Sequence, residues 1–115
     1  MLEYFKIKEF SKCLKKEWDK FCYKSNDAWL WHTYDGIVSK TQWSNHYNFS
    51  FSVIDVSNKK NIVAVVPLFL VKKFKIIDYS SFDSLGGPAI CDSLSKTKVN
   101  KLIFFINNYL TSLMK

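Results

Sequence analysis

The spacing of apolar and polar residues predicts a strand followed by two helices at the start of the chain. Apolar and charged residues alternate from Leu2 to Phe10, which is typical of a strand with one buried face. An amphipathic helix is predicted over about 12–23, where the apolar residues recur at helical spacing: Leu14, Trp18, Phe21 and Cys22. Ser11 precedes this helix and is a suitable N-cap residue. A second, shorter helix is predicted from Thr33 to about Trp43.

The middle of the chain has the pattern of an antiparallel hairpin. Residues 47–56 alternate between apolar and polar, which indicates a half-buried strand. Residues 62–71 are apolar on both faces, and the polar segment 57–61 predicts the turn between the two arms. Pro67 has no backbone N–H, so we expect the second arm to be bulged or unpaired around it.

The last third of the chain predicts a short strand over 74–79, a turn over 84–88 and a helix over 95–115. The apolar stripe of this helix is Val99, Leu102, Ile103, Ile106, Tyr109, Leu110 and Leu113. Phe104 and Phe105 fall partly outside the stripe, so we expect a cover on a second side of the helix. Together the elements predict one α/β domain of the α+β type over 1–115, with a mostly antiparallel sheet of about four strands, two N-terminal helices and a C-terminal amphipathic helix.

The net charge changes this picture little. The chain has a formal charge of +7, and all 17 basic residues are lysines. Specific readout of nucleic acids depends strongly on the forked guanidinium of arginine, which is absent, so we expect no specific nucleic-acid recognition. The lysines are scattered along the chain, and we interpret clusters such as 12–24 and 72–75 as solvated faces, with steering of an anionic ligand as the alternative.

Cysteine and histidine spacing indicates neither disulfides nor a metal site. Three cysteines form no Cys-x-x-Cys pair, and His32 and His46 lie fourteen residues apart with no cysteine near either. The N-terminus has no signal-peptide pattern, so we expect a reducing cytoplasmic location. The apolar stretch 62–71 is about half the length of a membrane-spanning helix, and we expect no membrane span.

The order of these elements, together with several short motifs, resembles the N-terminal half of FemAB-like proteins, which carry tandem acetyltransferase-like (GNAT) domains. The motifs are Glu17-Trp18-Asp19-Lys20-Phe21, Trp31-His32-Thr33, the apolar arm at 66–70, and Gly86-Gly87-Pro88. The resemblance covers about positions 12–110. It implies a GNAT-like partial domain, because the strands expected to follow the last helix are absent from the sequence.

The resemblance further implies the acceptor-side repeat of an N-acyltransferase or aminoacyltransferase that acts on an envelope or sugar-linked amine and is inactive alone. The acyl donor, acyl-CoA or aminoacyl-tRNA, would bind a missing second repeat or partner chain, so this chain alone should bind no cofactor. The substrate-binding residues expected here are His32, Lys40, Gly86 and Gly87. Lys40, at the end of the second predicted helix, matches a lysine that contacts acceptor phosphate in cell-wall members. Gly36 stands where those members tend to carry tryptophan, and this departure counts against the phosphate-contact role of Lys40.

The residues themselves identify no catalytic set. No spacing among the histidines and aspartates indicates a triad, a carboxylate pair or a metal site. His32 suits a hydrogen-bonded interior or cleft-wall residue better than a general base, and Gly86-Gly87 suits a turn, with close approach to a ligand as the alternative. Cys91 lies in a position where a loop nucleophile is an alternative to a structural thiol. The alternative function is a stand-alone small basic domain that binds an anionic or protein partner.

Overall fold

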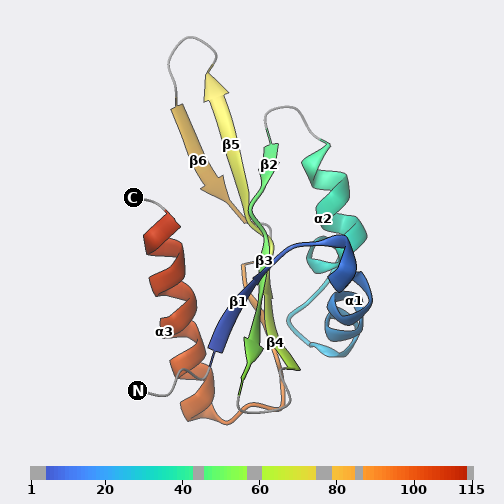
Figure 1. Ribbon diagram of the computed structural model, residues 1–115, viewed down its shortest axis with the longest axis vertical. Coiled ribbons are helices and arrows are strands. Elements are labelled where there is room, and N and C mark those ends of the chain that lie inside the picture. Colours follow the sequence, from blue (N-terminus) through green and yellow to red (C-terminus); the bar gives the residue numbers. More distant parts are fainter. Residues whose placement is uncertain (1–4, 43–45, 57–60, 75–78, 85–86, 114–115) are drawn as a thin grey trace.

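A computed structural model describes residues 5–42, 46–56, 61–74, 79–84 and 87–113. It has three layers: a central antiparallel sheet, α3 on one face, and α1 and α2 on the other (Figure 1). The elements in chain order are β1 (Phe5–Glu9), η1 (Lys12–Leu14), α1 (Lys15–Lys24), η2 (Leu30–His32), α2 (Tyr34–Thr41), β2 (His46–Asn48), β3 (Phe51–Asp55), β4 (Asn61–Val66), β5 (Phe69–Phe74), β6 (Tyr79–Asp83), β7 (Ala89–Ile90) and α3 (Lys96–Leu113).

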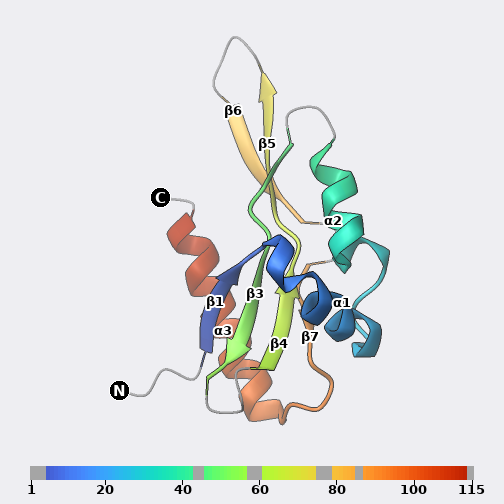
Figure 2. The same cartoon turned by 45° about the vertical axis from the view of Figure 1, so that its right-hand side comes forward.

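The strands form two antiparallel ladders. The central sheet has the order β1-β3-β4-β7, and a second, three-stranded sheet has the order β2-β5-β6. The β5–β6 hairpin extends beyond the three layers in Figure 1, and Figure 2 shows β7 beside β4 at the edge of the central sheet. The predicted α+β class is therefore confirmed, with a four-stranded antiparallel sheet, two N-terminal helices and a C-terminal helix.

The two sheets are separated by interruptions in both arms of the predicted hairpin, between β2 and β3 and between β4 and β5. β4 ends at Val66 and β5 begins at Phe69, so the expected interruption at Pro67 is confirmed. Across from it, Ser50 lies between β2 and β3, and its Oγ accepts a hydrogen bond from the Leu68 backbone N–H at 2.9 Å. The serine side chain thus satisfies a buried backbone donor at the point where the regular strand pairing is lost.

Both faces of the central sheet are covered. The cluster between the sheet and α3 consists of Phe5, Phe51, Val53, Val63, Ala64, Val66, Leu68, Leu102 and Ile106. The cluster on the α1 and α2 side consists of Trp18, Cys22, Ile37, Val65, Phe69, Val71 and Ala89. The prediction of a half-buried strand over 47–56 is consequently wrong for β3, in which all five residues are buried, including Ser52 and Asp55.

Local pattern misplaced two boundaries. Ser11 makes no side-chain capping bond, because the first turn is the 3-10 helix η1 and the α-helix begins only at Lys15. The predicted strand over 74–79 is also wrong. Its end residues belong to different strands and face each other, with Phe74 paired to Tyr79 across the β5–β6 ladder. A continuous strand would instead separate these two residues by about 16 Å.

α3 contacts the sheet with a narrower stripe than its sequence predicts. Leu102 and Ile106 are buried, whereas Ile103 is 41 % exposed. Phe105, which the stripe left partly outside, packs on Phe5 with ring centroids 5.7 Å apart. Phe104 is 68 % exposed, so the described residues do not cover the second side of the helix that the sequence analysis expected to be covered. Phe105, Tyr109, Leu110 and Leu113 also pack against the cluster that contains Leu102 and Ile106, whereas Ile103 is on the exposed side of the helix.

Candidate functional site

His32 joins two segments that are distant in the sequence. Its ring Nδ1 accepts a hydrogen bond from the Trp29 backbone N–H at 3.2 Å, and its Nε2 donates to the Gly87 carbonyl at 2.9 Å. Its own carbonyl accepts from Trp18 Nε1 at 2.7 Å. His32 is 1 % exposed, and both ring nitrogens are engaged by backbone groups. The arrangement requires the neutral Nε2–H tautomer and makes His32 a structural link rather than a proton acceptor for a substrate.

Of the two predicted glycines, Gly87 is described and Gly86 lies outside the described residues. Gly87 has φ of 65°, a left-handed conformation that favours glycine. A Cβ added at this position would meet no atom within 4 Å. The glycine therefore serves the backbone conformation of the turn, whose carbonyl accepts the His32 hydrogen bond.

Lys40 is placed apart from His32 and Gly87. It lies in the last turn of α2, whereas His32 belongs to η2, which precedes that helix. The side chain is 6 % exposed, and its Nζ lies 5.8 Å from the centroid of the Phe69 ring, a cation–π distance. The structure brings His32 and Gly87 together, but it packs Lys40 between α2 and β5.

Gly36 is required by close packing at the start of α2. Thr33 caps this helix, because its Oγ1 accepts a hydrogen bond from the Gly36 backbone N–H at 3.1 Å. The same hydroxyl donates to the Leu30 carbonyl at 2.7 Å. A Cβ at Gly36 would lie 2.1 Å from that carbonyl oxygen. No larger side chain fits at this position unless η2 moves away from α2.

Gly36→Ala is expected to lower the free energy of unfolding by about 1–3 kcal/mol, because η2 must move away from α2 to admit the methyl group. Chemical denaturation followed by tryptophan fluorescence measures the change. Ser39→Ala is the matched control, since Ser39 is exposed on the same helix and the substitution adds no atoms. A Gly36→Ala variant as stable as the control would show that the Leu30 carbonyl does not lie as close to Gly36 as described.

The segment 25–27 holds the outer edge of β7. Ser25 Oγ donates to the Ile90 carbonyl at 3.0 Å, and the Ile90 backbone N–H donates to Asp27 Oδ2 at 3.3 Å. The Asn26 backbone N–H donates to Asp92 Oδ2 at 2.9 Å. The end of α1 is thereby fixed against the residues that follow β7.

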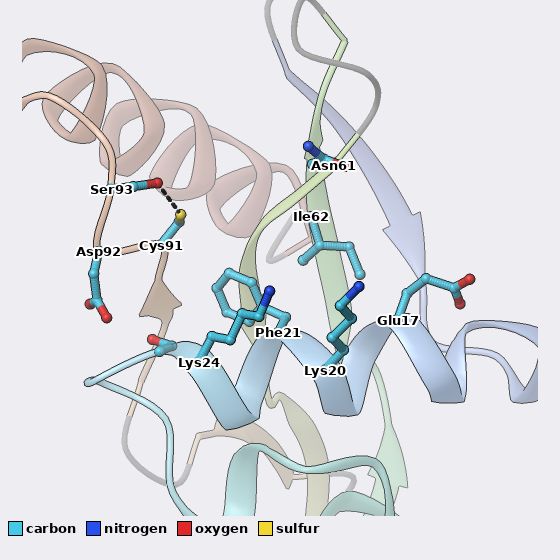
Figure 3. A pocket seen from close by; sticks show the side chains of 10 residues that line it. Glu17, Lys20, Phe21, Lys24, Asn61, Ile62, Cys91, Asp92 and Ser93 are labelled. Carbon is cyan, nitrogen blue, oxygen red and sulfur yellow. Dashed lines mark hydrogen bonds between the residues drawn. The ribbon is translucent and has the colours of Figure 1, made fainter.

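A cavity of about 560 Å³ lies at this junction. Residues from α1, the start of β4 and the segment after β7 line it, and they are Glu17, Lys20, Phe21, Lys24, Ser25, Asn61, Ile62, Cys91, Asp92 and Ser93 (Figure 3). The sequence analysis treated the lysines of 12–24 as a solvated face and missed this cavity. The available signal was the four-residue spacing of Lys20 and Lys24, which places both on one side of α1.

The three cysteines have different environments. Cys13 is exposed, Cys22 is buried and Cys91 is partly exposed, and all three are free thiols. Burial, together with the nearby charge of Asp19, raises the pKa of Cys22 to about 12. Its thiol also donates to the His32 carbonyl at 3.2 Å. Cys91 Sγ lies 3.1 Å from Ser93 Oγ in the cavity wall. Cys22 is thus an unreactive structural thiol, whereas the Cys91 thiol is accessible to small reagents from solvent.

Within the described ranges, no group of three or more histidine, cysteine or acidic side chains is arranged to hold a metal ion. In the same part of the chain, no helix combines the length and apolar character needed to cross a membrane. Comparisons of the sequence with protein-family models and with curated proteins, and of the fold with solved structures, find no match.

Proposed function

We propose that this chain is the acceptor-side half of a FemAB-like N-acyltransferase or aminoacyltransferase, GNAT-like in fold and inactive without a second repeat. The supporting observation is the arrangement of the central layer. An antiparallel sheet in the order β1-β3-β4-β7 carries α1 and α2 on one face and α3 on the other. This arrangement agrees with the resemblance in its α+β class, its mostly antiparallel sheet and its order of helices, and on that agreement the proposal rests. The amine acceptor would be an envelope or sugar-linked compound, and the acyl donor would bind the second repeat.

The positions of the expected substrate-binding residues refine this proposal. The hydrogen bond between His32 and Gly87 holds η2 against the turn that precedes β7. In this proposal the two residues shape the acceptor surface and do not contact the acceptor through reactive groups. Lys40 is buried against Phe69. Its ammonium group would contact an acceptor phosphate only if that phosphate entered the space between α2 and β5. In this proposal the first repeat therefore provides a rigid surface for the acceptor, and it supplies no reacting group.

The proposal is tested by isolating the chain with its natural binding partner. Affinity purification from the cells that produce it, followed by mass spectrometry, is expected to recover a chain with an acetyltransferase-like second repeat. The reconstituted pair should transfer an acyl group to an amine, whereas the isolated chain should show no acyl-CoA binding by calorimetry. Turnover of an acyl donor by the isolated chain, or micromolar affinity for acyl-CoA, would contradict the proposal.

A second candidate is a stand-alone basic domain that binds an anionic or protein partner. The observation in its favour is the exposed apolar surface of α3, where Ile103 is 41 % and Phe104 is 68 % exposed, on a chain with a charge of +7. The coding sequence downstream distinguishes the two candidates. An adjacent frame with an acyl-donor motif favours the acyltransferase half, and a folded monomer with no such frame favours the stand-alone domain.

A further inference from the structure

We propose that the cavity between α1, the start of β4 and residues 91–93 binds a small organic carboxylate with an aromatic or branched apolar body. The proposal rests on the cavity itself and does not depend on the acyltransferase function. Its volume of about 560 Å³ lies within the range of small-molecule binding sites in proteins. Such sites combine an apolar lining with a few polar groups that orient the ligand.

The apolar part of the lining comes from two elements that the fold holds together. Phe21 belongs to α1 and Ile62 to β4, and both are partly buried against the cluster on the α1 and α2 side of the sheet. Figure 3 shows the Phe21 ring and the Ile62 side chain at the cavity. These two side chains give an apolar ligand body a surface on which to displace water.

The cationic part comes from the last two turns of α1. Lys20 and Lys24 are one helical turn apart, so their side chains leave the helix on the same side. In Figure 3, Lys20 extends toward Ile62 and Lys24 passes across the Phe21 ring. Among the described residues, no carboxylate lies within ion-pair distance of either ammonium group. Two ammonium groups therefore border the apolar surface without an anionic partner of their own.

The two acidic residues of the lining, Glu17 and Asp92, form no ion pair with Lys20 or Lys24 among the described residues. Asp92 Oδ2 accepts the Asn26 backbone N–H at 2.9 Å, and Figure 3 shows Asp92 on the opposite side of the lining from Lys20. The Glu17 carboxylate also points away from Lys20 and Lys24 in that view. Lys20 and Lys24 lie between these two carboxylates in that view, so the ammonium groups are the charges nearest to Phe21 and Ile62, and this favours an anion there.

The chemistry of the lining selects among anions. Inorganic phosphate would use the ammonium groups but leave the Phe21 and Ile62 surface in contact with water. A carboxylate on an apolar body uses both parts of the lining, and the Cys91 and Ser93 side chains offer weak polar contacts at the opposite wall. The structure thus favours an organic carboxylate over a bare inorganic anion.

Cys91 allows a direct test, because its thiol lies in the cavity wall while Cys13 is an exposed thiol outside it. The protein is alkylated in parallel with iodoacetate and with neutral iodoacetamide, and the rate at each cysteine is followed by mass spectrometry. In each reaction the cysteine thiolate displaces iodide and the thiol proton passes to the buffer. We expect the iodoacetate-to-iodoacetamide rate ratio to be at least about threefold higher at Cys91 than at Cys13.

The second arm uses a ligand of the proposed class. We expect 2-naphthoate to slow the reaction of Cys91 with iodoacetamide, with no effect on Cys13, and we expect its neutral analogue 2-naphthamide to protect less. The double variant Lys20→Gln/Lys24→Gln should lose both the rate ratio and the protection. Lys6→Gln/Lys8→Gln removes the same charge from exposed positions that neither line the cavity nor adjoin Cys13 in the sequence, and it should retain both.

The two arms together decide the proposal. Equal rate ratios at Cys91 and Cys13, or equal protection by naphthoate and naphthamide, would overturn it. So would an equal loss in the two double variants, because the effect would then come from the overall charge of the protein. Circular dichroism of each variant confirms that the fold is retained, which we expect because all four lysines are exposed.

Discussion

Ile106→Asp is expected to prevent the chain from folding. Ile106 is 1 % exposed and lies in the cluster between α3 and the central sheet. An unpaired carboxylate in that cluster costs several kcal/mol, which is comparable to the whole stability of about 5–15 kcal/mol for a small domain. The far-ultraviolet circular dichroism of the purified variant should lack the native signal, or the variant should be recovered only as aggregate.

Ile103→Asp is the matched control on the same helix. Ile103 is 41 % exposed, so the new carboxylate remains in contact with water and the free energy of unfolding should fall by less than about 1 kcal/mol. Ile106→Ala provides a folded comparison and should lose about 2–5 kcal/mol in urea denaturation. If Ile103→Asp and Ile106→Asp were equally damaging, the orientation of α3 on the sheet would be wrong.

Lys98→Met is expected to destabilise the protein by about 3 kcal/mol. Lys98 Nζ forms an ion pair with Asp55, whose side chain is 0 % exposed at the end of β3. Removing the cation leaves a buried carboxylate without this partner, and such losses cost about 3–5 kcal/mol. We expect the lower end of that range, because the Lys98 side chain is 31 % exposed and water can replace part of the interaction. Denaturation curves at neutral pH measure the effect.

A double variant separates the ion pair from simple packing. Asp55→Asn/Lys98→Met removes both charges and should recover most of the stability lost by Lys98→Met alone. Lys96→Met in the same first turn of α3 is the control, because Lys96 is exposed, and it should change stability by less than about 0.5 kcal/mol. A double variant no more stable than Lys98→Met would show that the cost does not come from the charge that Lys98→Met leaves on Asp55.

The sequence could predict elements whose periodicity is local. The interruption at Pro67 followed from the missing N–H, and α2 begins at Tyr34, one residue after the predicted start at Thr33. The sequence failed where both faces of an element are covered. Ser52 alternates with Phe51 and Val53 in β3 and therefore suggests a solvent-facing side, yet it is buried. Alternation indicates an exposed face only if nothing packs on it, and local pattern does not contain that information.

The candidate site shows the same division. Sequence reasoning considered His32 and Cys91 one at a time, and it treated Lys20 as part of a solvated face. The hydrogen bond from His32 to Gly87 spans 55 residues, and those between segment 25–27 and residues 90–92 span 63 to 66. Contacts of that separation create the cavity, so no local motif could reveal it.

The sequence by itself determined the α+β class, the order of the main elements and the break at Pro67, because these depend on apolar periodicity and on backbone chemistry that act within a few residues. Only the tertiary structure decided that Lys40 is packed inside, that Gly36 admits no side chain, and that Lys20, Lys24 and Cys91 share a cavity. Those outcomes depend on which distant backbone and side-chain atoms meet once the layers have packed, and on how much water their contact excludes.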